Sequence, residues 1–70
     1  MSGMVISVDM IYGDTVEDSA ILTKVVDADK RDITELYRQF CRTNGFDVGR
    51  KSGIENAAIP FIKQHEALLP

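Results

Sequence analysis

Cys41 is the only cysteine and His65 the only histidine in this chain of 70 residues. A folded domain of this size buries only about 60% of the surface that its unfolded chain exposes, so it is marginally stable alone. Small domains usually gain stability from disulfides, a structural metal or association. One cysteine cannot form an internal disulfide, and one thiol with one imidazole does not supply the ligand set of a structural zinc site. We therefore expect no metal and no cofactor, and we predict a homodimer.

The composition is that of one small folded domain covering residues 1–70, with 44% hydrophobic and 27% charged residues. No apolar run approaches the roughly 20 residues that span a bilayer, so we expect no membrane partner. The first residues lack the basic segment of a signal peptide, and Asp9 interrupts their apolar stretch. Together with a single unpaired cysteine, these features favour the cytoplasm.

The net charge of −3 is unevenly distributed along the chain. Residues 1–36 hold eight acidic and three basic residues, a net charge of −5, whereas residues 37–70 hold five basic and three acidic residues, a net charge of +2. An acidic half repels nucleic acid, and a net charge of +2 is weak for a surface that binds it.

Two strands are predicted in the first half. Apolar and polar side chains alternate from Met4 to Tyr12, which is typical of a strand with one face in water. Gly13 and Asp14 suit a tight hairpin turn. The β-branched run over residues 19–27 predicts the returning strand.

A helix is the alternative for residues 14–26. Asp14 and Glu17 have the spacing of a capping box, and Leu22 and Val25 would share one helical face with the neighbouring Val26. The β-branched run and the turn residues favour the strand.

The clearest predicted element is a helix after Asp32. Its apolar stripe consists of Ile33, Leu36, Tyr37, Phe40 and Cys41. Asp32 can cap the first turn, with Glu35 in the capping-box position. Asn44 and Gly45 predict a left-handed stop, after which Phe46 folds back against Cys41.

A second helix is predicted from Ser52 to the end of the chain, with Ser52 as N-cap and Glu55 in the capping-box position. Pro60 predicts a kink, or alternatively two short helices that meet there. The expected fold class is therefore α+β: a two-stranded antiparallel hairpin followed by two helices.

The stretch NGFDVGRKSG resembles a phosphate-binding loop only superficially. Gly45 and Gly49 are too close for a Walker A loop, and Arg50 separates Gly49 from Lys51. What remains is a weak anion site beside the free amides of the next helix. Its candidate residues are Arg38, Arg42, Arg50, Lys51 and Ser52. A connector between helices is the favoured interpretation.

Other chemistries have weaker support. The acids Asp27, Asp29 and Asp32 lack the glycine and glutamate that a calcium loop requires. Cys41 and His65 are the only thiol and imidazole, and we expect both at the core rather than in a catalytic pair. Asp9 and Asp18 could face each other across the hairpin, but an exposed strand offers no cleft. We therefore expect no catalytic residue and no enzyme.

These observations favour a small non-enzymatic binding or regulatory module that acts through contacts with itself and with another protein. The alternative is a module that binds nucleic acid or a phosphate-bearing ligand through its basic residues. A small enzyme ranks third.

Overall fold

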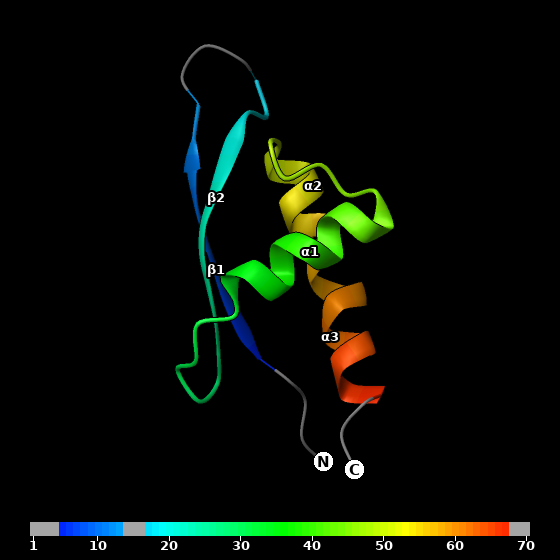
Figure 1. The fold of residues 1–70 in the computed structure, drawn as a ribbon. Helices are drawn as coiled ribbons and strands as arrows, with labels where there is room; N and C mark the ends of the chain where they lie inside the picture. The colour runs from blue at the N-terminus through cyan, green and yellow to red at the C-terminus, as the bar shows by residue number, and fades with distance from the viewer. Residues whose placement is uncertain (1–4, 14–16, 68–70) are drawn as a thin grey trace.

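The computed structural model describes residues 5–13 and 17–67 (Figure 1). Its elements follow the order β1 (Ile6–Tyr12), β2 (Ala20–Asp27), α1 (Thr34–Asn44), α2 (Lys51–Asn56) and α3 (Ala58–Ala67). The two strands form an antiparallel sheet, and the helices lie to one side of it. This arrangement confirms the predicted α+β class, with one helical segment more than expected.

The predicted strands correspond to β1 and β2. β1 begins at Ile6, and the predicted start at Met4 lies outside the described residues. Ile6, Val8 and Met10 are partly buried against the core, which confirms the predicted alternation, whereas Tyr12 is exposed. The β2 strand confirms the strand prediction, and the helix alternative is wrong for these residues.

A β-bulge interrupts the regular pairing of the two strands. Asp9 pairs with Lys24 and Met10 pairs with Leu22, so Thr23 is an extra residue in β2. As a result, Leu22 and Val25 are both buried although they lie three residues apart.

The connection between the strands is longer than predicted. Strand pairing ends at Tyr12 and Ala20, and the N–H of Gly13 donates to the carbonyl of Ser19 at 2.8 Å. A two-residue turn at Gly13 and Asp14 is therefore wrong, because residues 13–19 separate the strands. Asp14 itself lies outside the described residues.

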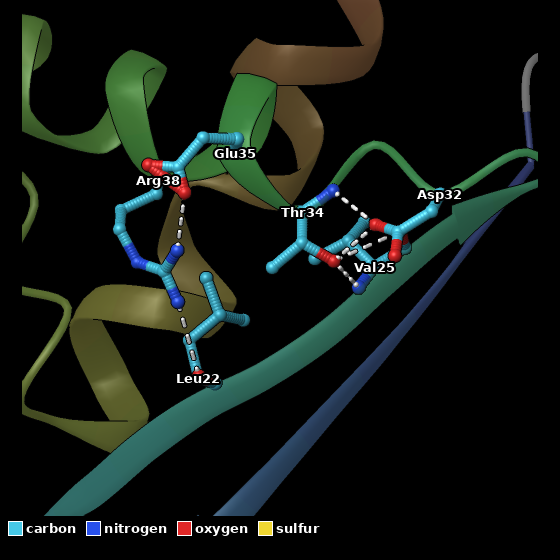
Figure 2. A network of polar contacts seen from close by, with 6 residues as sticks. All are labelled: Leu22, Val25, Asp32, Thr34, Glu35 and Arg38. Atoms are coloured by element: carbon cyan, nitrogen blue, oxygen red, sulfur yellow. Dashed lines mark hydrogen bonds and ion pairs between the residues drawn. The ribbon is translucent and has the colours of Figure 1, made fainter.

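A polar network joins β2 to the start of α1 (Figure 2). The hydroxyl of Thr34 donates to the carboxylate of Asp32 at 2.6 Å and accepts the backbone N–H of Val25 at 2.9 Å. Asp32 also accepts the backbone N–H of Thr34 at 3.0 Å. These hydrogen bonds from Thr34 hold the pKa of Asp32 below its ordinary value.

The predicted capping box of α1 is only partly correct. Asp32 accepts an amide at the helix start, but the N-cap position is Ile33, which makes no side-chain cap bond. Glu35 does not reach back to the cap and pairs instead with Arg38 at 2.6 Å. The guanidinium of Arg38 is a competing partner that the capping pattern does not reveal.

We expect Thr34→Val to lower the free energy of unfolding by about 1–3 kcal/mol, because it leaves the buried N–H of Val25 without its acceptor. Thr34→Ser retains the hydroxyl and is the matched control, with a much smaller expected loss. Urea unfolding of the three proteins measures the difference. A loss in Thr34→Val no larger than that in Thr34→Ser would contradict the hydrogen-bond argument.

The C-terminus of α1 ends as predicted. Gly45 has a left-handed backbone (φ 77°), and its N–H donates to the carbonyl of Arg42. The N–H of Phe46 donates to the carbonyl of Cys41 at 2.8 Å, which completes a Schellman motif. The ring of Phe46 stacks against Phe40, with a centroid separation of 6.1 Å.

α2 and α3 join into one bent helix. α2 ends at Asn56, and Ala57 keeps a helical backbone (φ −76°, ψ −17°) before α3 begins. Pro60 explains the position of the bend, because a proline ring crowds the carbonyl four residues earlier, which is that of Asn56. The N–H of Phe61 donates to the carbonyl of Ala57 at 2.9 Å, so helical bonding resumes after the break.

The core lies between β2 and the helices. Its buried residues are Ala20, Leu22, Val25, Tyr37, Phe40, Cys41, Ile54, Ala57 and Phe61. The hydroxyl of Tyr37 donates to the carbonyl of Ile54 and so links α1 to α2. Burial, together with the nearby Cys41 thiol, raises the pKa of Tyr37. Leu36 was predicted in the apolar stripe of α1, but it is 46% exposed and does not belong to the buried core.

Candidate functional site

The predicted anion site lies where the start of α2 meets the end of the hairpin connection. The N–H of Lys51 donates to the carbonyl of Asp18 at 2.8 Å, and the N–H of Ser52 donates to its carboxylate at 3.0 Å. The hydroxyl of Ser52 donates to the other carboxylate oxygen. The prediction of Ser52 as N-cap is therefore wrong. α2 begins at Lys51, and Arg50 holds the N-cap position without a side-chain cap bond.

Asp18 supplies the negative charge at this helix start. The hydrogen bonds from Ser52, helped by the charges of Arg50 and Lys51, hold the pKa of Asp18 below its usual value of 3.8. Asp18 has a left-handed backbone (φ 67°), which aspartate tolerates better than most residues. An external anion at this place would compete with a carboxylate of the protein itself.

We expect Asp18→Asn to lower the melting temperature at pH 7. Because the folded-state pKa lies below the unfolded value, the ionised carboxylate stabilises the fold above about pH 4, and this contribution disappears as the pH falls through the folded-state pKa. The variant should therefore show a shallower decline in melting temperature on acidification below about pH 4. Asp29→Asn removes an exposed carboxylate elsewhere and is the control. Identical acid profiles for Asp18→Asn and the native protein would contradict a stabilising carboxylate.

Most of the predicted basic residues contact groups of the protein. Arg38 pairs with Glu35 and donates to the carbonyl of Leu22 at 3.4 Å (Figure 2). Arg50 Nε lies 3.5 Å from the carboxylate of Asp47. These contacts partly neutralise the positive charges of the two guanidinium groups.

Lys51 and Arg42 complete the basic set. The ammonium of Lys51 lies 5.5 Å from the centre of the Tyr12 ring, within the range of a cation–π contact. Arg42 is exposed in the last turn of α1. The five predicted residues thus come from two places, α1 and the start of α2, and no contact joins them among the described residues.

Cys41 and His65 both lie at the core, as predicted. Cys41 is fully buried, and burial raises the pKa of its thiol, which disfavours the reactive thiolate. His65 is partly buried: its Nδ1 lies 3.0 Å from the carbonyl of Phe61, and its ring packs on Phe61 at 4.1 Å between centroids.

Asp9 and Asp18, which were considered as an acid pair and not favoured, do not face each other across the hairpin. Asp9 lies opposite Lys24 in the sheet, whereas Asp18 binds the start of α2. The intervening connection moves Asp18 away from the strand register.

Two of the three acids considered for calcium, Asp27 and Asp32, use their carboxylates in hydrogen bonds within the chain. The carboxylate of Asp27 accepts the N–H groups of Asp29 and Arg31 at 2.9 and 3.0 Å, and so closes the turn after β2. Within residues 5–13 and 17–67, no group of three or more His, Cys, Asp or Glu side chains is arranged to hold a metal ion.

A shallow groove of about 260 Å³ lies between α1 and α3. It is lined by Leu36, Gln39, Phe40, Thr43, Asn44, Gln64 and His65. Among these lining side chains only His65 is ionisable, so the groove offers no acid–base pair.

Sequence reasoning missed the exposed apolar side chains of the hairpin. Ile11 and Ile21 lie directly opposite each other and are 61% and 65% exposed, and Val5 and Tyr12 are also exposed. The alternation of the strands is the signal that could have found them, because Ile11 and Ile21 both lie one position away from inward-facing residues.

No helix in the described part of the chain combines the length and apolar character needed to cross a bilayer. The chain matches no model of a known protein family. It also has no match among the curated proteins or the solved structures.

Proposed function

We propose that this protein is a small non-enzymatic binding or regulatory module that acts through protein–protein contacts, including contacts with a second copy of itself. The observation that supports this function is the exposed pair of Ile11 and Ile21, which lie on the face of the sheet opposite to the buried Ala20 and Leu22. Directly opposed side chains have Cβ atoms about 4.5–5.5 Å apart, so the two form one continuous apolar surface. Contiguous exposed apolar surfaces often mark contact sites.

Asp9 and Lys24 give this surface a polar border. They lie opposite each other in the sheet, are exposed, and share the outward face with Ile11. Charged groups belong at the rims of protein interfaces. We therefore expect a partner that offers an apolar surface with charged groups at its border.

The alternative is binding of nucleic acid or another phosphate-bearing ligand through Arg38, Arg42, Arg50 and Lys51. Such binding weakens steeply as salt rises, because bound phosphates release counterions. Apolar contacts tolerate salt, so salt dependence separates the two functions.

The test compares three tagged proteins for the partner that each captures from the native lysate. They are the 70-residue chain itself, Ile11→Thr/Ile21→Thr and Ile59→Thr. Threonine keeps the β-branched shape, and Ile59 is an equally exposed isoleucine on α3 that serves as the matched control. Capture is measured at low and high salt, with and without nuclease.

We expect nuclease-resistant, salt-tolerant capture that the double variant loses and Ile59→Thr retains. Capture that nuclease or moderate salt abolishes would favour the phosphate alternative. Capture that survives the double substitution would contradict the role of the outer sheet face.

A further inference from the structure

The backbone groups on the outer edge of β2 are hydrogen-bonded to other parts of the chain. Backbone groups that point away from β1 bond to the loop before α2, to α1 or to the turn after β2. They belong to Ala20, Leu22, Val25 and Asp27. β2 therefore offers little for a further strand to bind.

The outer edge of β1, unlike that of β2, exposes backbone groups near the loop. The N–H of Gly13 donates to the carbonyl of Ser19, whereas the N–H of Ala20 points away from β1 and donates to Gly49. Hydrogen-bonded and non-hydrogen-bonded pairs alternate along antiparallel strands. Tyr12 and Met10 fall in the non-hydrogen-bonded positions, so their backbone N–H and C=O groups point away from β2.

The same orientation continues beyond the bulge. Val25 and Asp27 direct their bonds away from β1, so their partners Val8 and Ile6 also point backbone groups outward. Within residues 5–13 and 17–67, the outward backbone N–H and C=O groups of β1 form no hydrogen bond. An open strand edge of this kind is a template for another strand.

We infer that β1 pairs antiparallel with β1 of a second copy, with the two-fold axis at Val8, to form a four-stranded sheet. This inference rests on the self-association included in the proposed function and names its surface and register. A two-fold axis makes the interface self-complementary, because each strand is both donor and acceptor.

Charge and shape select this register. With Val8 at the centre, Asp9 lies opposite Ser7 of the second copy, and Val5 lies opposite Ile11. With Asp9 at the centre, two carboxylates would lie directly opposite each other, which is destabilising. With Met10 at the centre, each Asp9 would face Ile11. The Val8 register alone pairs Val5 with Ile11.

The pairing also covers apolar surface on both faces of the sheet. On the outer face, Val5 of the second copy extends the Ile11 and Ile21 pair into one row of three aliphatic side chains. On the inner face, Ile6 and Val8 are only partly buried, and the incoming strand covers them. A second copy therefore satisfies the backbone edge and the side chains together.

The experiment measures the dimer dissociation constant of the full chain by sedimentation equilibrium for the native protein, Ser7→Lys and Ser7→Glu. Lysine at position 7 would face Asp9 of the second copy, and glutamate would place like charges there. We expect the dissociation constant to fall about threefold to tenfold for Ser7→Lys and to rise about threefold to tenfold for Ser7→Glu, because each contact occurs twice. The difference should shrink in high salt.

Thr43→Lys and Thr43→Glu are the charge-matched controls, since Thr43 is exposed on α1. Circular dichroism verifies that each variant is folded. Opposite responses at Ser7 that exceed those at Thr43 support the inference. Equal responses at the two positions, or weakening by both Ser7 substitutions, would overturn the register.

A native protein that stays monomeric at high concentration would overturn the pairing as a whole. That outcome leaves the capture experiment on Ile11 and Ile21 independent, because binding of a different protein does not require the β1 edge. If the native protein captures no partner although its dimer is intact and charge-sensitive, the proposed contact with another protein is contradicted.

Discussion

Replacing Gly53 with alanine is expected to destabilise the protein by about 3 kcal/mol, although alanine is the better helix former. Gly53 lies within α2, where the change would ordinarily gain about 1 kcal/mol. Here an added Cβ would lie 2.1 Å from the carbonyl oxygen of Asp47 and 2.8 Å from its backbone nitrogen and carbonyl carbon. Backbone atoms move only if the whole loop shifts, so the clash outweighs the helix propensity.

The melting temperature measures this effect. A loss of 1 kcal/mol lowers it by about 4–8 °C in a domain of this size, so Gly53→Ala should lower it by more than about 12 °C. Gly49→Ala is the close control, because its Cβ would meet only the side-chain carboxylate of Asp47, at 3.2 Å. Gly45→Ala has open space around the Cβ but a left-handed backbone, and should lose about 1 kcal/mol. A native-like melting temperature for Gly53→Ala would show that the loop yields.

The α1 helix could be predicted from the sequence because its signals are local. Tyr37, Phe40 and Cys41 recur at helical spacing and are all buried. Gly45 marks the left-handed end, where the backbone bonds of a Schellman motif form. Each of these signals depends on residues within two turns of one another, so no distant partner could change them.

The ambiguity over β2 has a physical origin in the bulge. Leu22 and Val25 are three residues apart, which is the spacing of a helical face as well as of a bulged strand. Only the pairing with β1 shows that Thr23 is the extra residue. A sequence without its partner strand cannot distinguish the two patterns.

The side chain that satisfies the first amides of α2 could not be predicted, because it is distant in sequence. Ser52 and Glu55 have the spacing of a capping box, yet Ser52 donates to Asp18, 34 residues earlier. The same fold brings Asp47 against Gly53. Local patterns indicate that a helix begins here, whereas the tertiary contact decides which side chain satisfies its amides.

The candidate site was predicted only as a set of charges. Arg38 was predicted within the first helix and Arg50 beside the start of the second. Their acidic partners depend on side-chain geometry. The apolar pair of Ile11 and Ile21 depends on strand register, which the sequence does not give.

Phe61→Ala is expected to lower the free energy of unfolding by about 3–5 kcal/mol, a large part of the stability of a small domain. Phe61 is fully buried, and its ring contacts Tyr37 and Phe40 at centroid distances of 4.9 and 5.4 Å. Over residues 58–66 it is the one buried side chain of α3. Its truncation therefore removes the main attachment of that helix to the core.

This attachment predicts a local as well as a global effect. In Phe61→Ala, backbone amides of α3 should exchange with deuterium much faster than those of α1, because a helix of this length is marginal without packing. Phe61→Leu keeps most of the apolar volume and should lose less than about 1.5 kcal/mol. Ile59→Ala truncates an exposed side chain of the same helix and should change exchange in α3 little. Equal protection of α1 and α3 in Phe61→Ala would mean that the continuous bend from α2, rather than the Phe61 ring, holds α3 in place.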